Sequence, residues 1–139
     1  MVAYLDSSVV LRHILLGDES IRHALSCERI ISSELLEIEC RRVLHRYRMN
    51  GDLDDDGFIK ASNRLKEVLA GVSLLVLSAS VKRKASGAFP VVVKTLDALH
   101  LASALVFSET VGHETVLVFS HDASLCRCAA ALGFTVPFG

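Results

Sequence analysis

The chain has 139 residues, of which 51% are hydrophobic and 22% are charged, and its formal net charge is −1. This composition is typical of one compact domain with a buried core, here residues 1–139, rather than of a disordered chain. The net charge argues against a protein coated in basic surface for nucleic acid but does not exclude a local basic groove. No apolar run approaches the ~18 to 20 residues of a membrane span, and no signal peptide opens the chain, so we expect a cytoplasmic protein with no membrane contact.

Strands and helices are predicted to alternate along the chain. The first strand, over 2–5, runs into Asp6, and the polar residues Ser7 and Ser8 separate it from a helix over 9–16. The further predicted elements are a helix over 19–26, a strand over 29–32, helices over 34–49 and 54–69, a strand over 73–77, helices over 80–88 and 95–108, a strand over 115–119, a helix over 122–132 and a strand over 134–136. Thr95 is expected to cap the helix that it opens. This alternation predicts an α/β fold, namely a three-layer α/β/α sandwich with a central, mainly parallel twisted sheet.

The cysteines give little indication of function. A chain of this size with four cysteines (Cys27, Cys40, Cys126 and Cys128) has no disulfide framework. Cys126 and Cys128 are one residue apart, whereas zinc ligands are usually separated by two to four residues. A metal site formed by this pair with His113 and His121 is therefore a minor alternative.

Two acids follow predicted buried strands. Asp6 comes directly after the first strand, and Asp122 comes after the apolar run 116–119 and the pair Ser120 and His121. The carboxyl ends of parallel strands lie at the edge of the sheet where ligands bind. Capping of the following helix explains Asp122 taken alone, but the repeated arrangement favours one shared site.

Glu39 lies within the apolar stripe of its helix, four residues after Leu35 and four before Val43. A buried carboxylate is costly unless it is paired or bound to a metal. Two interpretations therefore stay open: Glu39 points inward to a site, or it lies at the edge of the stripe and pairs with Arg42 or Arg46.

Asp97 occupies the first turn of the helix over 95–108, where an acid favours the helix dipole. Taken alone, capping is the simpler explanation for this residue. His100 lies one turn further on and shares its face, and we expect it to be a hydrogen-bonded helper rather than a metal ligand.

Four carboxylates in one place repel one another, and their pKa values rise unless cations neutralise them. The natural occupant of such a cluster is Mg²⁺ or Mn²⁺, which take oxygen ligands. A site of this kind hydrolyses phosphodiesters by activating water and stabilising the leaving oxygen.

The sequence resembles a PIN-domain ribonuclease, specifically the VapC-type toxin of bacterial and archaeal toxin–antitoxin pairs. The resemblance covers essentially the whole chain and rests on four ordered blocks: 4–10; Ser33 and Glu39 with 42–44; 95–102; and 118–122 with 129–130 and 132–134. It implies a single PIN domain whose catalytic, metal-binding cluster is Asp6, Glu39, Asp97 and Asp122, with Asp6 and Asp97 as the most direct ligands of Mg²⁺ or Mn²⁺. Ser7, Ser8 and Ser120 match small hydroxyl residues that orient ligands or water, and Ser120 replaces the more usual threonine.

The same resemblance implies the partners of the protein. They are an RNA substrate, a second copy in a homodimer, and a cognate antitoxin whose C-terminal segment lies in the active-site groove. Arg42, Arg46 and Lys94 are candidates for holding RNA phosphates, although basic residues on helices are often simply solvated.

Two other function classes remain open at this point. One is a non-catalytic PIN-like scaffold that binds RNA or a partner protein without cutting RNA. The other is an α/β phosphohydrolase, which also places an aspartate after its first strand. Such enzymes typically need a second acid two residues on, and that position is Ser8 here.

Overall fold

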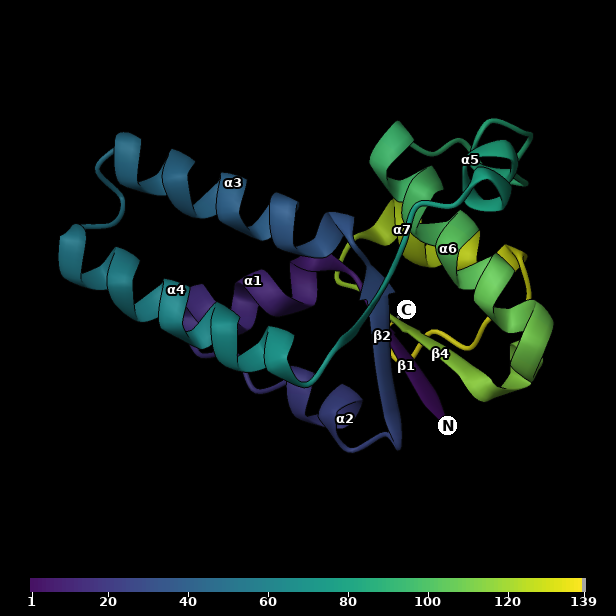
Figure 1. The fold of residues 1–139 in the computed structure, drawn as a ribbon, viewed down its shortest axis with the longest axis horizontal. Helices are drawn as coiled ribbons and strands as arrows, with labels where there is room; N and C mark the ends of the chain where they lie inside the picture. Colours follow the sequence, from purple (N-terminus) through teal and green to yellow (C-terminus); the bar gives the residue numbers. More distant parts are fainter. Residues whose placement is uncertain (139) are drawn as a thin grey trace.

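The computed structural model describes residues 1–138, and its elements alternate as the sequence predicts (Figure 1). The strands are β1 (Val2–Leu5), β2 (Arg29–Ser33), β3 (Ser73–Leu75) and β4 (Val116–Phe119). The helices are α1 (Ser7–Leu16), α2 (Ile21–Leu25), α3 (Leu35–Met49), α4 (Asp55–Ala70), α5 (Ala79–Ala85), α6 (Thr95–Val111) and α7 (Ala123–Ala131), with a 3-10 turn, η1 (His113–Thr115), before β4. Over residues 1–138, no helix combines the length and the apolarity needed to cross a membrane.

All pairings in the four-stranded sheet are parallel, and the strand order is β3-β2-β1-β4. From β1 the chain adds β2 and then β3 on one side, whereas β4 pairs with the other side of β1, with Leu5 opposite Phe119. The order of the strands therefore reverses between β1 and β4. The crevice outside the carboxyl ends of two such strands is where open α/β sheets bind ligands.

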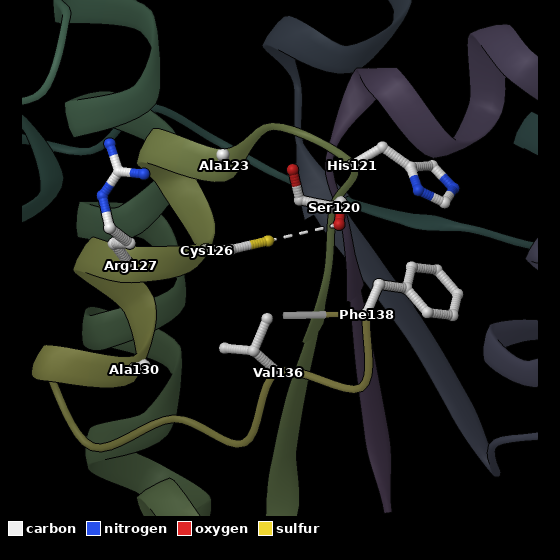
Figure 2. A pocket seen from close by; sticks show the side chains of 8 residues that line it. All are labelled: Ser120, His121, Ala123, Cys126, Arg127, Ala130, Val136 and Phe138. Atoms are coloured by element: carbon white, nitrogen blue, oxygen red, sulfur yellow. Dashed lines mark hydrogen bonds between the residues drawn. The ribbon is translucent and has the colours of Figure 1, made fainter.

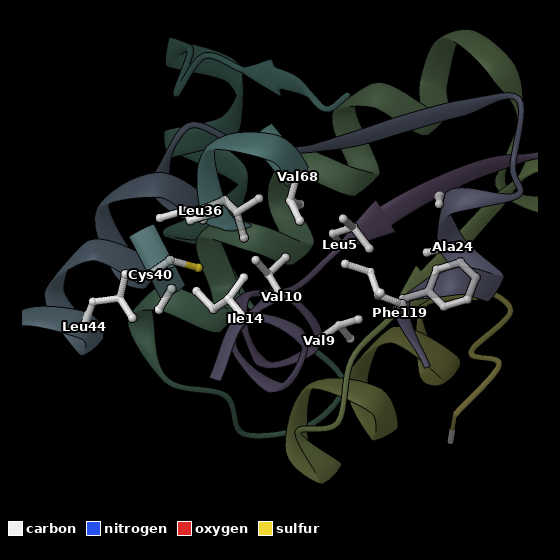
Figure 3. Packing of buried hydrophobic residues seen from close by; sticks show 14 residues of the cluster. Leu5, Val9, Val10, Ile14, Ala24, Leu36, Cys40, Leu44, Val68 and Phe119 are labelled. Carbon is white, nitrogen blue, oxygen red and sulfur yellow. The ribbon is translucent and has the colours of Figure 1, made fainter. Parts of the chain in front are cut away.

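Helices cover both faces of the sheet, so the predicted three-layer architecture is confirmed. Helices α1 to α4 lie on one face and α5 to α7 on the other (Figure 1). Neighbouring residues of a strand point to opposite faces, and β1 serves both cores. Leu5 packs with Val10 and Leu36 in one core (Figure 3), whereas Tyr4 belongs to the other core with Leu101.

Three local predictions need correction. Helix α1 begins directly after the extended residue Asp6, earlier than expected. Thr95 does not cap α6 but is its first helical residue, and Lys94 precedes it without a side-chain cap. The predicted last strand over 134–136 is not a strand in the structure. It contributes only an isolated parallel bridge, between Thr135 and Leu117 of β4.

Candidate active site

Asp6 lies at the crevice and is only 4% exposed. Its Oδ2 accepts hydrogen bonds from Ser8 Oγ and Ser120 Oγ, both at 2.7 Å. The two hydroxyls also accept from the loop after β4: Ser8 Oγ from the backbone N–H of His121, and Ser120 Oγ from that of Asp122, each at 2.9 Å. The serines thus fix the Asp6 carboxylate and join the end of β1 to the end of β4.

Glu39 comes from α3, and its side chain is 18% exposed. It is hydrogen-bonded to Nε2 of His100 on α6, whereas Arg42 and Arg46 are exposed on α3. Of the two interpretations left open by the sequence, pairing with an arginine is therefore wrong. Burial opposes the protonation of His100, but the hydrogen bond and the charge of Glu39 outweigh it and raise the pKa of His100.

Asp97 lies in the first turn of α6, and no side-chain cap is made at that helix start within residues 1–138. Of the simpler explanation, only the favourable position of an acid in the first turn, near the positive end of the helix dipole, therefore remains for Asp97. Burial, and then the negative charges of Asp122 and Asp6, raise the pKa of Asp97 to about 6.

Asp122 does cap α7, because its Oδ1 accepts from the backbone N–H groups of Ser124 and Leu125 at 2.9 and 3.1 Å.

One pocket of about 500 Å³ brings the four acids together at the crevice. Its lining residues are Asp6, Ser7, Ser8, Leu11, Glu39, Lys94, Thr95, Leu96, Asp97 and Asp122. The acids come from the end of β1, from α3, from α6 and from the start of α7. Leu11 and Leu96 give the pocket an apolar wall that the sequence did not indicate.

The donors around this pocket suit a hard divalent cation, since they are carboxylate oxygens. The raised pKa of Asp97 also fits, because burial and then the negative charges of Asp122 and Asp6 disfavour its ionised form, which a bound cation would favour. In the conformation described for residues 1–138, however, no three His, Cys, Asp or Glu side chains are close enough to hold one ion. Mg²⁺ usually takes only one or two carboxylates directly and keeps several waters, so the observed spacing of the acids is compatible with such an ion.

The candidate phosphate-binding residues are distributed unequally. Lys94 and the supporting residue Ser7 line the acidic pocket. Arg42 and Arg46 are exposed on α3 and are not among its lining residues. Of the three basic candidates, Lys94 is therefore the one that the structure places beside the acids.

Tyr4 is a site residue that sequence reasoning missed. Its hydroxyl lies 2.7 Å from His100 Nδ1, and both side chains are buried. Strand alternation places Tyr4 on the face of β1 opposite Leu5, where α6 packs, and a buried tyrosine hydroxyl requires a partner. That requirement was the available signal, but it does not say which residue the partner is.

A second cavity, of about 510 Å³, lies beside Ser120, between α7 and the C-terminal segment that carries Val136 and Phe138 (Figure 2). The thiol of Cys126 faces it and donates to the carbonyl oxygen of Ser120 at 3.2 Å. His121 stacks on Phe138 with ring centroids 4.9 Å apart. The thiol and the His121 ring are thus engaged in contacts of their own, which does not favour the cysteine–histidine alternative.

Comparison with known proteins identifies the family. The PIN domain matches residues 3–131. The fold is similar to that of VapBC2 from Rickettsia felis, crystallised with a DNA fragment from their promoter, at a TM-score of 0.68, 11% identity and coverage of 98% of this chain and 97% of that chain. It is also similar to PAE2754 from Pyrobaculum aerophilum, at a TM-score of 0.61, 20% identity and coverage of 96% and 81%. No curated protein sequence matches the chain significantly. At these identities the two solved structures speak for the fold alone, and it is the match over residues 3–131 that shows that the chain belongs to the PIN-domain family.

Proposed function

We propose that this chain is the toxin of a type II toxin–antitoxin pair and acts as a Mg²⁺- or Mn²⁺-dependent endoribonuclease. The observation that carries the proposal is the convergence of Asp6, Glu39, Asp97 and Asp122 on one pocket at the crevice between β1 and β4. RNA as the substrate is supported by membership of the PIN-domain family, and the toxin role by the likeness of the fold to VapBC2. We take residues 1–139 as a single domain that acts in the cytoplasm, where its substrate is.

Each acid has a distinct role in this proposal. When bound, the cation supplies an activated water and stabilises the leaving oxygen of a phosphodiester. Asp6 and Asp97 are the most direct ligands, and Glu39 and Asp122 complete the set directly or through water. Ser8 and Ser120 hold the Asp6 carboxylate through Oδ2. Since an opposite charge favours the ionised form of a carboxyl group, Asp97 loses its proton more readily when the cation is present.

The RNA backbone is held by basic residues around the acids. In this proposal Lys94 contacts a phosphate next to the scissile bond, and its position in the lining of the pocket supports that role. Arg42 and Arg46 are exposed on α3 and would contact phosphates further along the strand. Such contacts position the substrate without reading its sequence, so they leave the identity of the RNA open.

The proposed protein partners are a second copy of the chain and a cognate antitoxin. An antitoxin segment lying in the groove would meet Leu96, which is 47% exposed and lines the pocket. Co-expression tests this part of the proposal. Growth should stop when the chain is expressed alone and resume when a small neighbouring gene is expressed with it, and growth arrest that no such gene relieves would contradict it.

Cleavage of RNA in Mg²⁺ and in excess chelator tests the proposed activity. We expect Asp6→Asn and Asp97→Asn each to abolish the Mg²⁺-dependent cleavage, since each removes a negative ligand while nearly preserving shape. Asp52→Asn is the matched control, because Asp52 is exposed in the loop after α3 and does not line the pocket. Undiminished cleavage by both site variants would contradict the proposal.

A further inference from the structure

A buried chain of hydrogen bonds ends at Glu39. Tyr4 Oη on β1 is 2.7 Å from His100 Nδ1 on α6, and His100 Nε2 contacts Glu39 Oε1 on α3. Tyr4 and His100 are each 1% exposed, whereas the Glu39 side chain is 18% exposed and reaches the pocket. The Tyr4 and His100 rings meet edge-on, at 83° and with centroids 5.8 Å apart. The chain thus connects a strand of the central sheet to one of the four acids.

The chemistry of the groups fixes the direction of these bonds. A carboxylate can only accept, so the hydrogen between His100 and Glu39 belongs to Nε2. In the neutral imidazole Nδ1 then accepts, and the Tyr4 hydroxyl is the donor. In the imidazolium Nε2 still donates to Glu39. The bond to Glu39 therefore has the same direction in either protonation state.

We propose that His100, itself held by Tyr4, is a positioning residue that orients the Glu39 carboxylate for metal binding. This inference rests on the proposed metal site. Imidazole and carboxylate groups behind metal ligands commonly fix the orientation of those ligands, and their loss lowers metal affinity by about 10- to 100-fold. Oε1 is engaged by His100, and within residues 1–138 no hydrogen bond engages Oε2. Because Glu39 lines the pocket, Oε2 is the carboxylate oxygen left to bind a metal ion there.

A purely structural role for His100 predicts something different. In that case the imidazole only fills space and satisfies Tyr4, and any substitution that folds leaves metal binding unchanged. Two amide substitutions separate the alternatives, because each keeps one half of the hydrogen-bond chain. In His100→Gln the amide reaches the position of Nε2 and can donate to Glu39. In His100→Asn the shorter amide occupies the position of Nδ1 and can contact Tyr4 only.

The experiment measures Mn²⁺ affinity calorimetrically for the wild-type protein and both variants, with thermal unfolding as the check on folding. We expect His100→Asn to bind Mn²⁺ about tenfold more weakly or worse, while His100→Gln stays close to wild type. Both variants lose the imidazole ring, so their losses of thermal stability should be similar. Equal Mn²⁺ affinities for the two folded variants would overturn the proposal.

A metal-free measurement separates failure of this inference from failure of the proposed function. Ring ¹⁵N chemical shifts of His100 distinguish the protonated from the unprotonated nitrogen. We expect Nε2 to carry the proton in the wild-type protein without metal, and an unprotonated Nε2 would overturn the inference. Wild-type protein that shows the protonated Nε2 but binds no Mn²⁺ would refute the metal site, and with it the role of His100 in metal binding. Wild-type protein that binds Mn²⁺ with Nε2 unprotonated would refute the positioning role alone.

Discussion

Replacing Asp97 by asparagine should stabilise the metal-free protein at neutral pH, although it removes an acid of the proposed metal site. The pKa of Asp97 rises from 3.8 to about 6, first because of burial and then because of the charges of Asp122 and Asp6. Since the folded-state pKa lies above the unfolded-state value, the folded protein binds the proton more tightly. The free energy of unfolding therefore falls as pH rises through this window and stays low above it.

The size of the expected gain in stability follows from the rise in the pKa of Asp97. A change from 3.8 to about 6 is about 2 units, which at about 1.36 kcal/mol per unit sets an upper bound of about 3 kcal/mol. Solvent screening of a partly exposed carboxylate reduces the expected gain to about 1 to 2 kcal/mol. Asparagine avoids the cost because it is neutral, and it leaves no cavity because its shape is nearly that of aspartate.

Urea unfolding in the presence of chelator measures the gain. The difference between Asp97→Asn and wild type should be small at about pH 4, grow up to about pH 6.5 and then remain constant. Asp52→Asn, at an exposed loop position, should show no such pH-dependent gain. A lower stability of Asp97→Asn than of wild type at about pH 7.5, or a gain that is the same at both ends of the pH range, would contradict this cost of the ionised Asp97.

Three further predictions concern the support of the site, the binding of RNA and the core. Ser120→Ala should cost about 1 to 3 kcal/mol in urea unfolding and weaken Mn²⁺ binding, because the buried hydroxyl serves both Asp6 and the loop after β4; unchanged stability would contradict this. Lys94→Ala should weaken RNA binding in a fluorescence titration and flatten its dependence on salt, without changing stability; an unchanged salt slope would remove Lys94 from the phosphate contacts. Leu65→Ala should lower the free energy of unfolding by about 2 to 5 kcal/mol, because Leu65 is fully buried in the core that also contains Leu5. Leu16→Ala, at a residue 79% exposed, should lower it far less. Equal losses of stability would contradict this description of the core.

The sequence predicts most of the fold because its periodicities are local. The apolar run 116–119 and the strand before Asp6 identify two neighbouring parallel strands, and both acids that follow them lie at the same edge of the sheet. The position of Glu39 within a helical stripe likewise makes an inward orientation one of the two interpretations that the sequence leaves open. These inferences depend only on geometry that is repeated within each element.

The partners across elements could not be predicted in this way. Glu39 and His100 are 61 residues apart, and their contact depends on how α3 and α6 meet at the sheet. From the sequence alone, Arg42 and Arg46 are equally plausible partners, because they lie on the same helix as Glu39. Asp122 illustrates a different limit: from the sequence, capping α7 and lining the pocket are alternative roles, but the carboxylate does both.

The binding of Mn²⁺ by the wild-type protein and by its Asp6→Asn and Asp97→Asn variants tests most directly the claim that the four acids form one metal site. Titration calorimetry at neutral pH should show binding by the wild type and severe loss of affinity in each variant, with folding intact by circular dichroism. Absence of binding by the wild-type protein, or affinity that neither substitution reduces, would contradict the proposed metal centre.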